Sequence, residues 1–167
     1  ASVTITAPPS GAVYLVGEPI WFTGSFADPG VLDTHTATWS FDGVDQAAPV
    51  TESGGSGTTG LLTSFSAPGV YSVRLTVADD DGSATTASTV DGLEALVVVY
   101  DTSAGFVVGS GWINSPAGAY LADPTATGKA TFGFVSKYAK GANVPTGNTE
   151  LKFKAVNLDF SSTSYEW

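Results

Sequence analysis

Apolar and polar residues alternate with a period of two through most of the chain. In the stretch GVYSVRLTV, Tyr71, Val73, Leu75 and Val77 fall on one face, and the residues between them are polar or charged. Alternation of this kind predicts a strand with one buried face. The same pattern, or a short β-branched run, recurs in SVTIT, AVYLV, PIWFTGSF and HTATWSF. No window shows the 3.6-residue period of an amphipathic helix.

Turn-forming residues separate these predicted strands. Between Ala7 and Gly82 they include Pro8-Pro9-Ser10-Gly11, Asp28-Pro29-Gly30, Asp42-Gly43, Ala67-Pro68-Gly69 and Asp81-Gly82. Short strands separated by turns roughly every 8 to 12 residues predict a β-sandwich. Trp21 and Trp39 lie on two of these strands, and we expect both rings in the core.

The longest apolar run is short. Ala95 to Tyr100 reads ALVVVY, which predicts a buried strand. A membrane-spanning helix needs about 18 or more apolar residues, so no membrane insertion is expected. The N-terminus has no basic, hydrophobic leader, so any secretory signal is expected to have been removed or to lie outside this sequence.

Charge is distributed unevenly. The first 100 residues hold 11 acidic residues and one basic residue, whereas residues 101–167 hold five of each. This asymmetry predicts two domains, 1–100 and 101–167. An acidic first half argues against nucleic acid and anionic membranes as partners, because both require a basic surface. It favours cations.

The first part of the chain resembles PKD domains. The run from Gly69 to Val77 followed by Asp79-Asp80-Asp81-Gly82 is similar to the GxYxVxLxVxDxxG signature of that family. The segments Ala27 to Gly30 and Asp33 to Trp39 are similar to its loop and central strand. The resemblance covers about residues 2–100 and implies a non-catalytic, immunoglobulin-like β-sandwich from a secreted or surface protein. The family usually reads WDFGDG where this chain reads WSFDG, so the turn after Trp39 is expected to differ.

The second part resembles the β domain that follows PKD repeats in some bacterial secreted proteins. The segments that carry this resemblance are AGFVVGSGWI, from Ala104, and GKATFGFV, from Gly128. It implies a second antiparallel β module over 101–167, incomplete at its C-terminus because the sequence stops within a predicted strand. An unpaired strand edge there would favour association between copies of the chain.

Two groups of acids form a candidate calcium site. Asp28 and Asp33 precede the Trp39 strand, and Asp79 and Asp80 follow the Val70 strand. In an immunoglobulin-like sandwich these two loops lie at the same end. Calcium prefers six to eight oxygen ligands, many of them carboxylates. The resemblance agrees, since some PKD modules of bacterial collagenases bind calcium at this end. The alternative is a solvated acidic rim in which Asp81-Gly82 merely makes the hairpin turn.

Catalytic residues are scarce. His35 is the only histidine, and cysteine is absent. His35 sits beside the alternating Trp39 strand, and we expect a core or edge histidine held by a hydrogen bond. The chain therefore lacks most of the residues that form a Ser-His or Cys-His catalytic pair or a zinc site. No enzyme activity is expected.

Carbohydrate binding is the alternative function. Aromatic side chains on β-sandwich modules can stack on sugars, and the candidates are Trp112, Tyr120, Tyr138 and Trp167. For each of them, packing in the core or at a sheet edge competes with a role as a platform. The sequence therefore predicts an all-β, non-catalytic extracellular module that acts in spacing, adhesion or presentation, with a candidate site for structural Ca²⁺. The alternative is a carbohydrate-binding accessory module of a secreted hydrolase.

Overall fold

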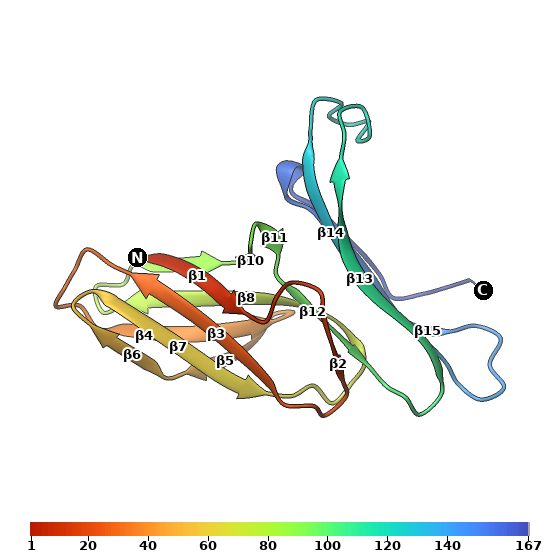
Figure 1. The fold of residues 1–167 in the computed structure, drawn as a ribbon, viewed down its shortest axis with the longest axis horizontal. Coiled ribbons are helices and arrows are strands. Elements are labelled where there is room, and N and C mark those ends of the chain that lie inside the picture. Colours follow the sequence, from red (N-terminus) through yellow and green to blue (C-terminus); the bar gives the residue numbers. More distant parts are fainter. Residues whose placement is uncertain (167) are drawn as a thin grey trace. The chain divides into compact units, whose positions relative to one another are not determined.

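The computed structural model describes residues 1–166 and is built almost entirely from β-strands (Figure 1). The described residues contain one 3₁₀ turn, η1 (Lys154–Val156), and no α-helix. No helix among them is long and apolar enough to cross a membrane. The chain forms two compact units that interleave along the sequence. Unit 1 holds Ala1–Pro9, Pro19–Ser64 and Ser72–Ala95, and unit 2 holds Ser10–Glu18, Phe65–Tyr71 and the described residues from Leu96 onward.

One layer of unit 1 is an antiparallel sheet of four strands. Their order across the sheet is β1 (Ser2–Ala7), β3 (Ile20–Ala27), β7 (Ser56–Thr63) and β6 (Val50–Ser53). Phe22 on β3 lies opposite Leu61 on β7, and Trp21 lies opposite Leu62. This register fixes which side chains share a face, because neighbouring residues of a strand point to opposite sides.

The other layer is centred on β4 (His35–Phe41), which pairs antiparallel with β5 (Val44–Ala48) and β8 (Gly69–Asp79). The strand order of this sheet is β2-β12-β8-β4-β5, where β2 is Ala12–Leu15 and β12 is Leu96–Tyr100. Strand β9 (Ala84–Ala87) also pairs with β8, and β8 contributes residues to both units. A small separate hairpin joins β10 (Thr89–Val90) to β11 (Leu93–Glu94).

Aromatic side chains fill the space between the two layers of unit 1. Trp39 and Phe22 are fully buried, and their ring centroids lie 5.7 Å apart. The ring centroids of Phe41 and Phe22 lie 4.7 Å apart. The layers also approach closely at Gly24, where a Cβ atom would lie 2.3 Å from Leu75. Two antiparallel layers around an apolar core are the immunoglobulin-like β-sandwich that the sequence predicted.

The prediction that Trp21 lies in the core is wrong. Its side chain is 59% exposed, whereas Phe22 beside it is completely buried. The two residues are adjacent on one strand and must face opposite sides of the sheet. Phe22 takes the inward position together with Phe26, so Trp21 is turned to solvent.

The antiparallel β module expected in the second part of the chain is present in unit 2. Its strands are β13 (Gly105–Ser115), β14 (Gly128–Tyr138), β15 (Thr146–Phe153) and β16 (Leu158–Ser162), paired in that order. One face of this sheet packs Val135 against Val70, Leu96 and Val98. A second small core joins Ala126, Ala130 and Phe153.

Unit 2 also contains segments that precede residue 101. The amide oxygen and nitrogen of Asn148 bond the backbone N–H and C=O of Val70, at 2.9 and 3.3 Å. Strands β2 and β12 form a parallel pair in this unit. The compact units are thus discontinuous in sequence, whereas the sequence predicted one boundary near Tyr100. That boundary stays a prediction.

Candidate functional site

Two acidic loops of unit 1 are joined by a pair of hydrogen bonds. The loop between β3 and β4 ends at Thr34, and the hairpin between β8 and β9 begins at Asp79. The N–H of Thr34 donates to Oδ1 of Asp80 at 3.0 Å, and the N–H of Asp80 donates to the carbonyl oxygen of Thr34 at 3.1 Å. The two groups of acids therefore meet at one end of the sandwich, as the sequence predicted.

Three of the four predicted calcium ligands already bond backbone N–H groups. Oδ1 of Asp28 accepts from Gly30 at 2.7 Å, and its Oδ2 lies 2.8 Å from the nitrogen of Ala1. Oδ1 of Asp79 accepts from Ser83 at 2.7 Å across the hairpin, and Oδ1 of Asp80 accepts from Thr34. These are the side-chain-to-backbone bonds that fix turns rich in aspartate.

The turn itself is made differently from the prediction. Gly82 has a positive φ of 90°, as a tight turn requires, but Asp81 does not. Asp79 closes the turn instead: its N–H donates to the carbonyl oxygen of Ser83 at 2.9 Å, and its carboxylate accepts from the N–H of Ser83.

The neighbouring aspartates make the charged form of Asp33 unfavourable. Loss of hydration raises its pKa, and the negative charges of Asp81, Asp80, Asp28 and Asp79 raise it further. Its carboxylate lies over Gly30, where an added Cβ would come within 1.8 Å of Oδ2. A side chain at position 30 would therefore require the Asp33 carboxylate to move.

The cluster has the chemistry for a divalent cation but not the geometry of a formed cage. Carboxylate and backbone oxygens of this kind suit Ca²⁺. Within residues 1–166, however, no group of three or more His, Asp or Glu side chains is arranged to hold a metal ion. Binding would require Asp33 and the hairpin acids to turn their remaining oxygens toward a common point.

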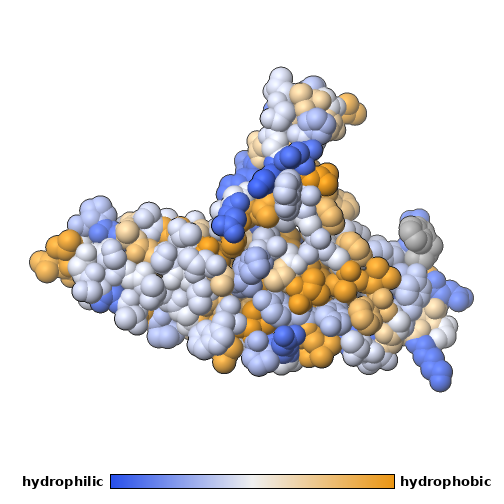
Figure 2. All heavy atoms as spheres, in the orientation of Figure 1, coloured by the Kyte–Doolittle hydropathy of each residue, from blue (hydrophilic) through white to orange (hydrophobic). Residues whose placement is uncertain are grey.

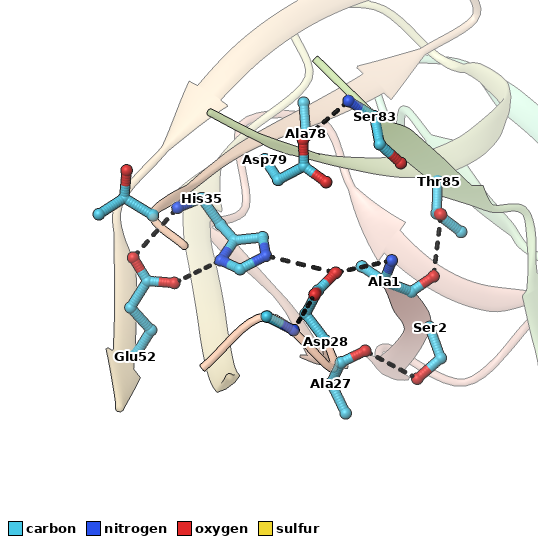
Figure 3. Close-up of polar contacts among 12 residues, drawn as sticks. Ala1, Ser2, Ala27, Asp28, His35, Glu52, Ala78, Asp79, Ser83 and Thr85 are labelled. Carbon is cyan, nitrogen blue, oxygen red and sulfur yellow. Dashed lines mark hydrogen bonds and ion pairs between the residues drawn. The ribbon is translucent and has the colours of Figure 1, made fainter. Parts of the chain in front are cut away.

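His35 lies beneath this acidic end and is held by two carboxylates (Figure 3). Its Nδ1 is 2.7 Å from Oε2 of Glu52, and its backbone N–H donates to Oε1 of the same residue at 3.1 Å. Its Nε2 lies 3.7 Å from Oδ2 of Asp28. The ring is buried and packs on Phe26, with centroids 4.6 Å apart. The expectation of a core histidine held by a hydrogen bond is confirmed.

The carboxylates change the titration of this histidine. Burial on its own would lower the pKa of His35, but the hydrogen bond and charge of Glu52, followed by the negative charge of Asp28, outweigh it and raise the pKa above its usual value. Glu52 was not singled out from the sequence. The sequence feature that could have identified it is its position two residues after Val50. This spacing puts both side chains on one face of β6, the face that turns toward the core.

The predicted sugar-stacking residues have other neighbours. Trp112 is 46% exposed, but the ammonium group of Lys129 lies over its ring, 4.6 Å from the centroid. Tyr120 packs edge-on against Phe153 at 6.5 Å. Tyr138 is partly exposed beside a groove of about 610 Å³ that Val107, Phe134 and Tyr165 also line. Trp167 lies outside the described residues.

Comparison with solved structures finds all-β modules of low sequence identity. Fibronectin(III)-like modules of CbhA from Clostridium thermocellum share 11% identity over 82% of this chain and 85% of theirs, with a TM-score of 0.43. The ICAM-5 D1–D4 ectodomain fragment shares 11% over 98% of this chain and 46% of its own, with a TM-score of 0.45. The N-terminal Ig1-2 module of the Drosophila receptor protein tyrosine phosphatase DLAR shares 11% over 99% and 96%, with a TM-score of 0.37.

No curated protein matches the chain significantly. A family model does match part of it: the PKD domain model covers residues 11–92. This range includes β3, β4 and β8, the strands that form the sandwich core. The resemblance seen in the sequence is therefore supported for the first part of the chain, and the assignment of 101–167 to a post-PKD domain stays a prediction. Residues 11–92 match the PKD domain, an immunoglobulin-like module type that is typically non-catalytic and common in extracellular proteins.

Proposed function

We propose that this chain is a non-catalytic extracellular module that spaces, presents or mediates adhesion within a larger secreted or cell-surface protein. The observation that supports this best is that its histidine and three of its loop aspartates are already bonded within the fold. The chain's only histidine is buried and bonded to Glu52. Asp28 and Asp79 bond the backbone of their own loops, and Asp80 bonds the backbone of the neighbouring loop at Thr34. Groups committed in this way stabilise a fold, whereas a general acid or base must reach a substrate.

Calcium is the second part of the proposal. A divalent cation at the joined loops would offset the mutual repulsion of Asp33 and the hairpin acids, whose charges raise the pKa of Asp33. Extracellular calcium modules bind with a Kd on the order of 10⁻⁴ to 10⁻³ M. At ten times the Kd, binding to the folded state alone adds about 1.4 kcal/mol to the free energy of unfolding. The ion would tie the loops together as a structural element.

The test is thermal unfolding of the chain in CaCl₂, in MgCl₂ and with a chelator. Millimolar calcium should raise Tm by roughly 4 to 8 °C, because about 1 kcal/mol shifts a domain of 60–100 residues by that amount. Magnesium should do much less, since it dehydrates reluctantly and needs near-ideal octahedral geometry. Asp80→Asn keeps an oxygen that can accept from Thr34 and removes the charge, so it should weaken the calcium response without unfolding the module. Superimposable curves in all three conditions would exclude the calcium part and leave the spacer role standing.

The spacer role is tested by a separate measurement of mechanical unfolding. The chain can be placed between reference domains and stretched in a single-molecule force experiment. A load-bearing module should give a discrete unfolding event, because the paired strands of both sheets must separate together. Extension without such an event would contradict a mechanical role, whatever the calcium result.

A further inference from the structure

The outer face of sheet β1-β3-β7-β6 is lined with hydroxyl groups. The strand registers put one set of residues on this face, away from the aromatic core. Apart from Trp21 and Leu62, every member is a serine, a threonine or a small residue: Ser2, Thr4, Thr23, Ser25, Ala27, Thr51, Ser53, Ser56, Thr58 and Gly60. At the irregularity in β1, the hydroxyl of Thr6 joins them and lies 2.8 Å from that of Thr23.

This face carries no charged side chain, although the protein has a net charge of −10. Glu52 lies on β6, but its carboxylate is bonded to His35 beneath the opposite face. In the orientation of Figures 1 and 2 the sheet lies in front, and its surface is drawn mainly in the pale colours of near-neutral hydropathy. An uncharged face on an acidic module gives no electrostatic attraction to an ionic partner.

Trp21 stands at one end of this hydroxyl face. It is 59% exposed, and Leu62 opposite it on β7 is 50% exposed. The six-membered ring of Trp21 leans over Gly60, 3.5 Å from where a Cβ on that glycine would lie. Interaction sites are commonly built on exposed apolar groups rimmed by polar ones, and tryptophan is among the side chains enriched at binding hot spots.

We infer that this face is a docking surface for a neutral polysaccharide. A sugar ring presents apolar C–H groups on its flat side and hydroxyls around its rim. Trp21 with Leu62 supplies the apolar platform. The serine and threonine hydroxyls, each a donor and an acceptor, supply partners for the rim. These groups repeat about every 4.8 Å across the strands and roughly 6.7 Å along them, over the extended surface of four strands.

The distribution of charge on the protein indicates that the polysaccharide is neutral. An acidic glycan would meet a protein of charge −10 on a face without lysine or arginine. The single basic residue of the first 100, Arg74, lies on β8 in the other layer. A cationic glycan would be drawn to the aspartate cluster and away from the uncharged face. A neutral chain is the occupant that this face fits.

The experiment is a binding assay of the whole chain on insoluble cellulose, xylan and mannan, with polygalacturonate as the acidic comparison. The wild type should bind at least one neutral polymer, and Trp21→Ala should weaken that binding at least tenfold, as expected for the main aromatic contact of a binding surface. Trp112→Ala is the matched control, because it removes an exposed tryptophan from unit 2. Thr58→Val removes a hydroxyl without changing the shape and should weaken binding less than Trp21→Ala does. Melting curves show that each variant is folded.

Three results would overturn the inference. These are the absence of wild-type binding to every neutral polymer, a preference for polygalacturonate, and equal losses from Trp21→Ala and Trp112→Ala. The calcium response is independent of this surface. Trp21→Ala should leave it unchanged, so failure of one proposal is distinguishable from failure of the other.

Discussion

Glu52 holds His35 at two points, through Nδ1 of the ring at 2.7 Å and through the backbone N–H at 3.1 Å. The two residues come from different sheets, since β6 belongs to one layer of the sandwich and β4 to the other. Their contact therefore ties the two layers together directly beneath the acidic loops (Figure 3).

The first prediction concerns the pH dependence of this contact. The folded state raises the pKa of His35, so the charged imidazole adds stability that is complete below its unfolded pKa of about 6.5. That stability is lost as the pH rises through the folded-state pKa. Glu52→Gln should lower the pKa of His35 and flatten this part of the stability curve. NMR titration of the ring and unfolding by urea between pH 5 and 9 measure both effects.

Asp45→Asn is the control for this experiment, because Asp45 is an exposed acid on β5. It changes the net charge by the same amount as Glu52→Gln and should leave the pKa of His35 as it is. Equal shifts in both variants would show that overall charge sets this pKa and would contradict a specific role for Glu52.

The second prediction is that Asp33→Asn stabilises unit 1 in the presence of a chelator. A carboxyl whose folded pKa is raised contributes stability at low pH and loses it as it ionises, so at neutral pH the Asp33 charge is unfavourable. The amide removes this charge at nearly constant size. Tm of the variant should exceed that of the wild type at pH 7, and the difference should vanish near pH 3. A lower Tm at pH 7 would mean that Asp33 has a favourable partner.

The third prediction concerns the start of the four-stranded sheet in unit 2. The Lys137 ammonium bonds the Asp101 carboxylate, and with Ser103 it lowers the pKa of Asp101 to about 2. A lowered pKa means stability that is present above the unfolded value and lost as the pH falls toward 2. Asp101→Asn should therefore lower Tm at pH 7 and have little effect near pH 2. Ser103→Ala should show a smaller loss, and equal losses at both pH values would exclude an electrostatic cause.

The fourth prediction is that fluorescence quenching distinguishes the exposed Trp21 from the buried Trp39. Trp39 is fully buried and Trp21 is largely exposed. Trp21→Phe should remove emission that acrylamide quenches readily, and Trp39→Phe should remove protected emission. If Trp21→Phe left the quenchable fraction unchanged, Trp21 would have to face the core, and the inward position of Phe22 on β3 would be wrong.

The fifth prediction concerns association of the chain with itself. The order β13-β14-β15-β16 leaves β16 as an edge strand, and Phe160 on it is 50% exposed. Unpaired edges favour pairing with another copy, and a lysine on an edge opposes it. Sedimentation should show a concentration-dependent dimer that Phe160→Lys weakens. A monomer at all concentrations up to the millimolar range would rule out this association.

Alternation and short apolar runs were sufficient to predict strands β1 to β4, β8 and β12, and together with the turn residues they predicted the sandwich, which in turn predicted that the two acidic loops meet. These features follow from local periodicity and from a general rule about where loops of a sandwich lie. Trp39 was assigned to the core correctly because its strand, HTATWSF, alternates without ambiguity.

Tertiary structure alone decided which of Trp21 and Phe22 is buried, which carboxylate holds His35, and which acid closes the hairpin. Two adjacent large apolar residues fit an inward or an outward assignment equally well, and the choice depends on the register with β7. The pairing of Glu52 with His35 joins residues of opposite layers, and no local pattern records such a contact. The sequence determines the periods and the charges, whereas the packing of the two layers determines which face each side chain takes and what it meets there.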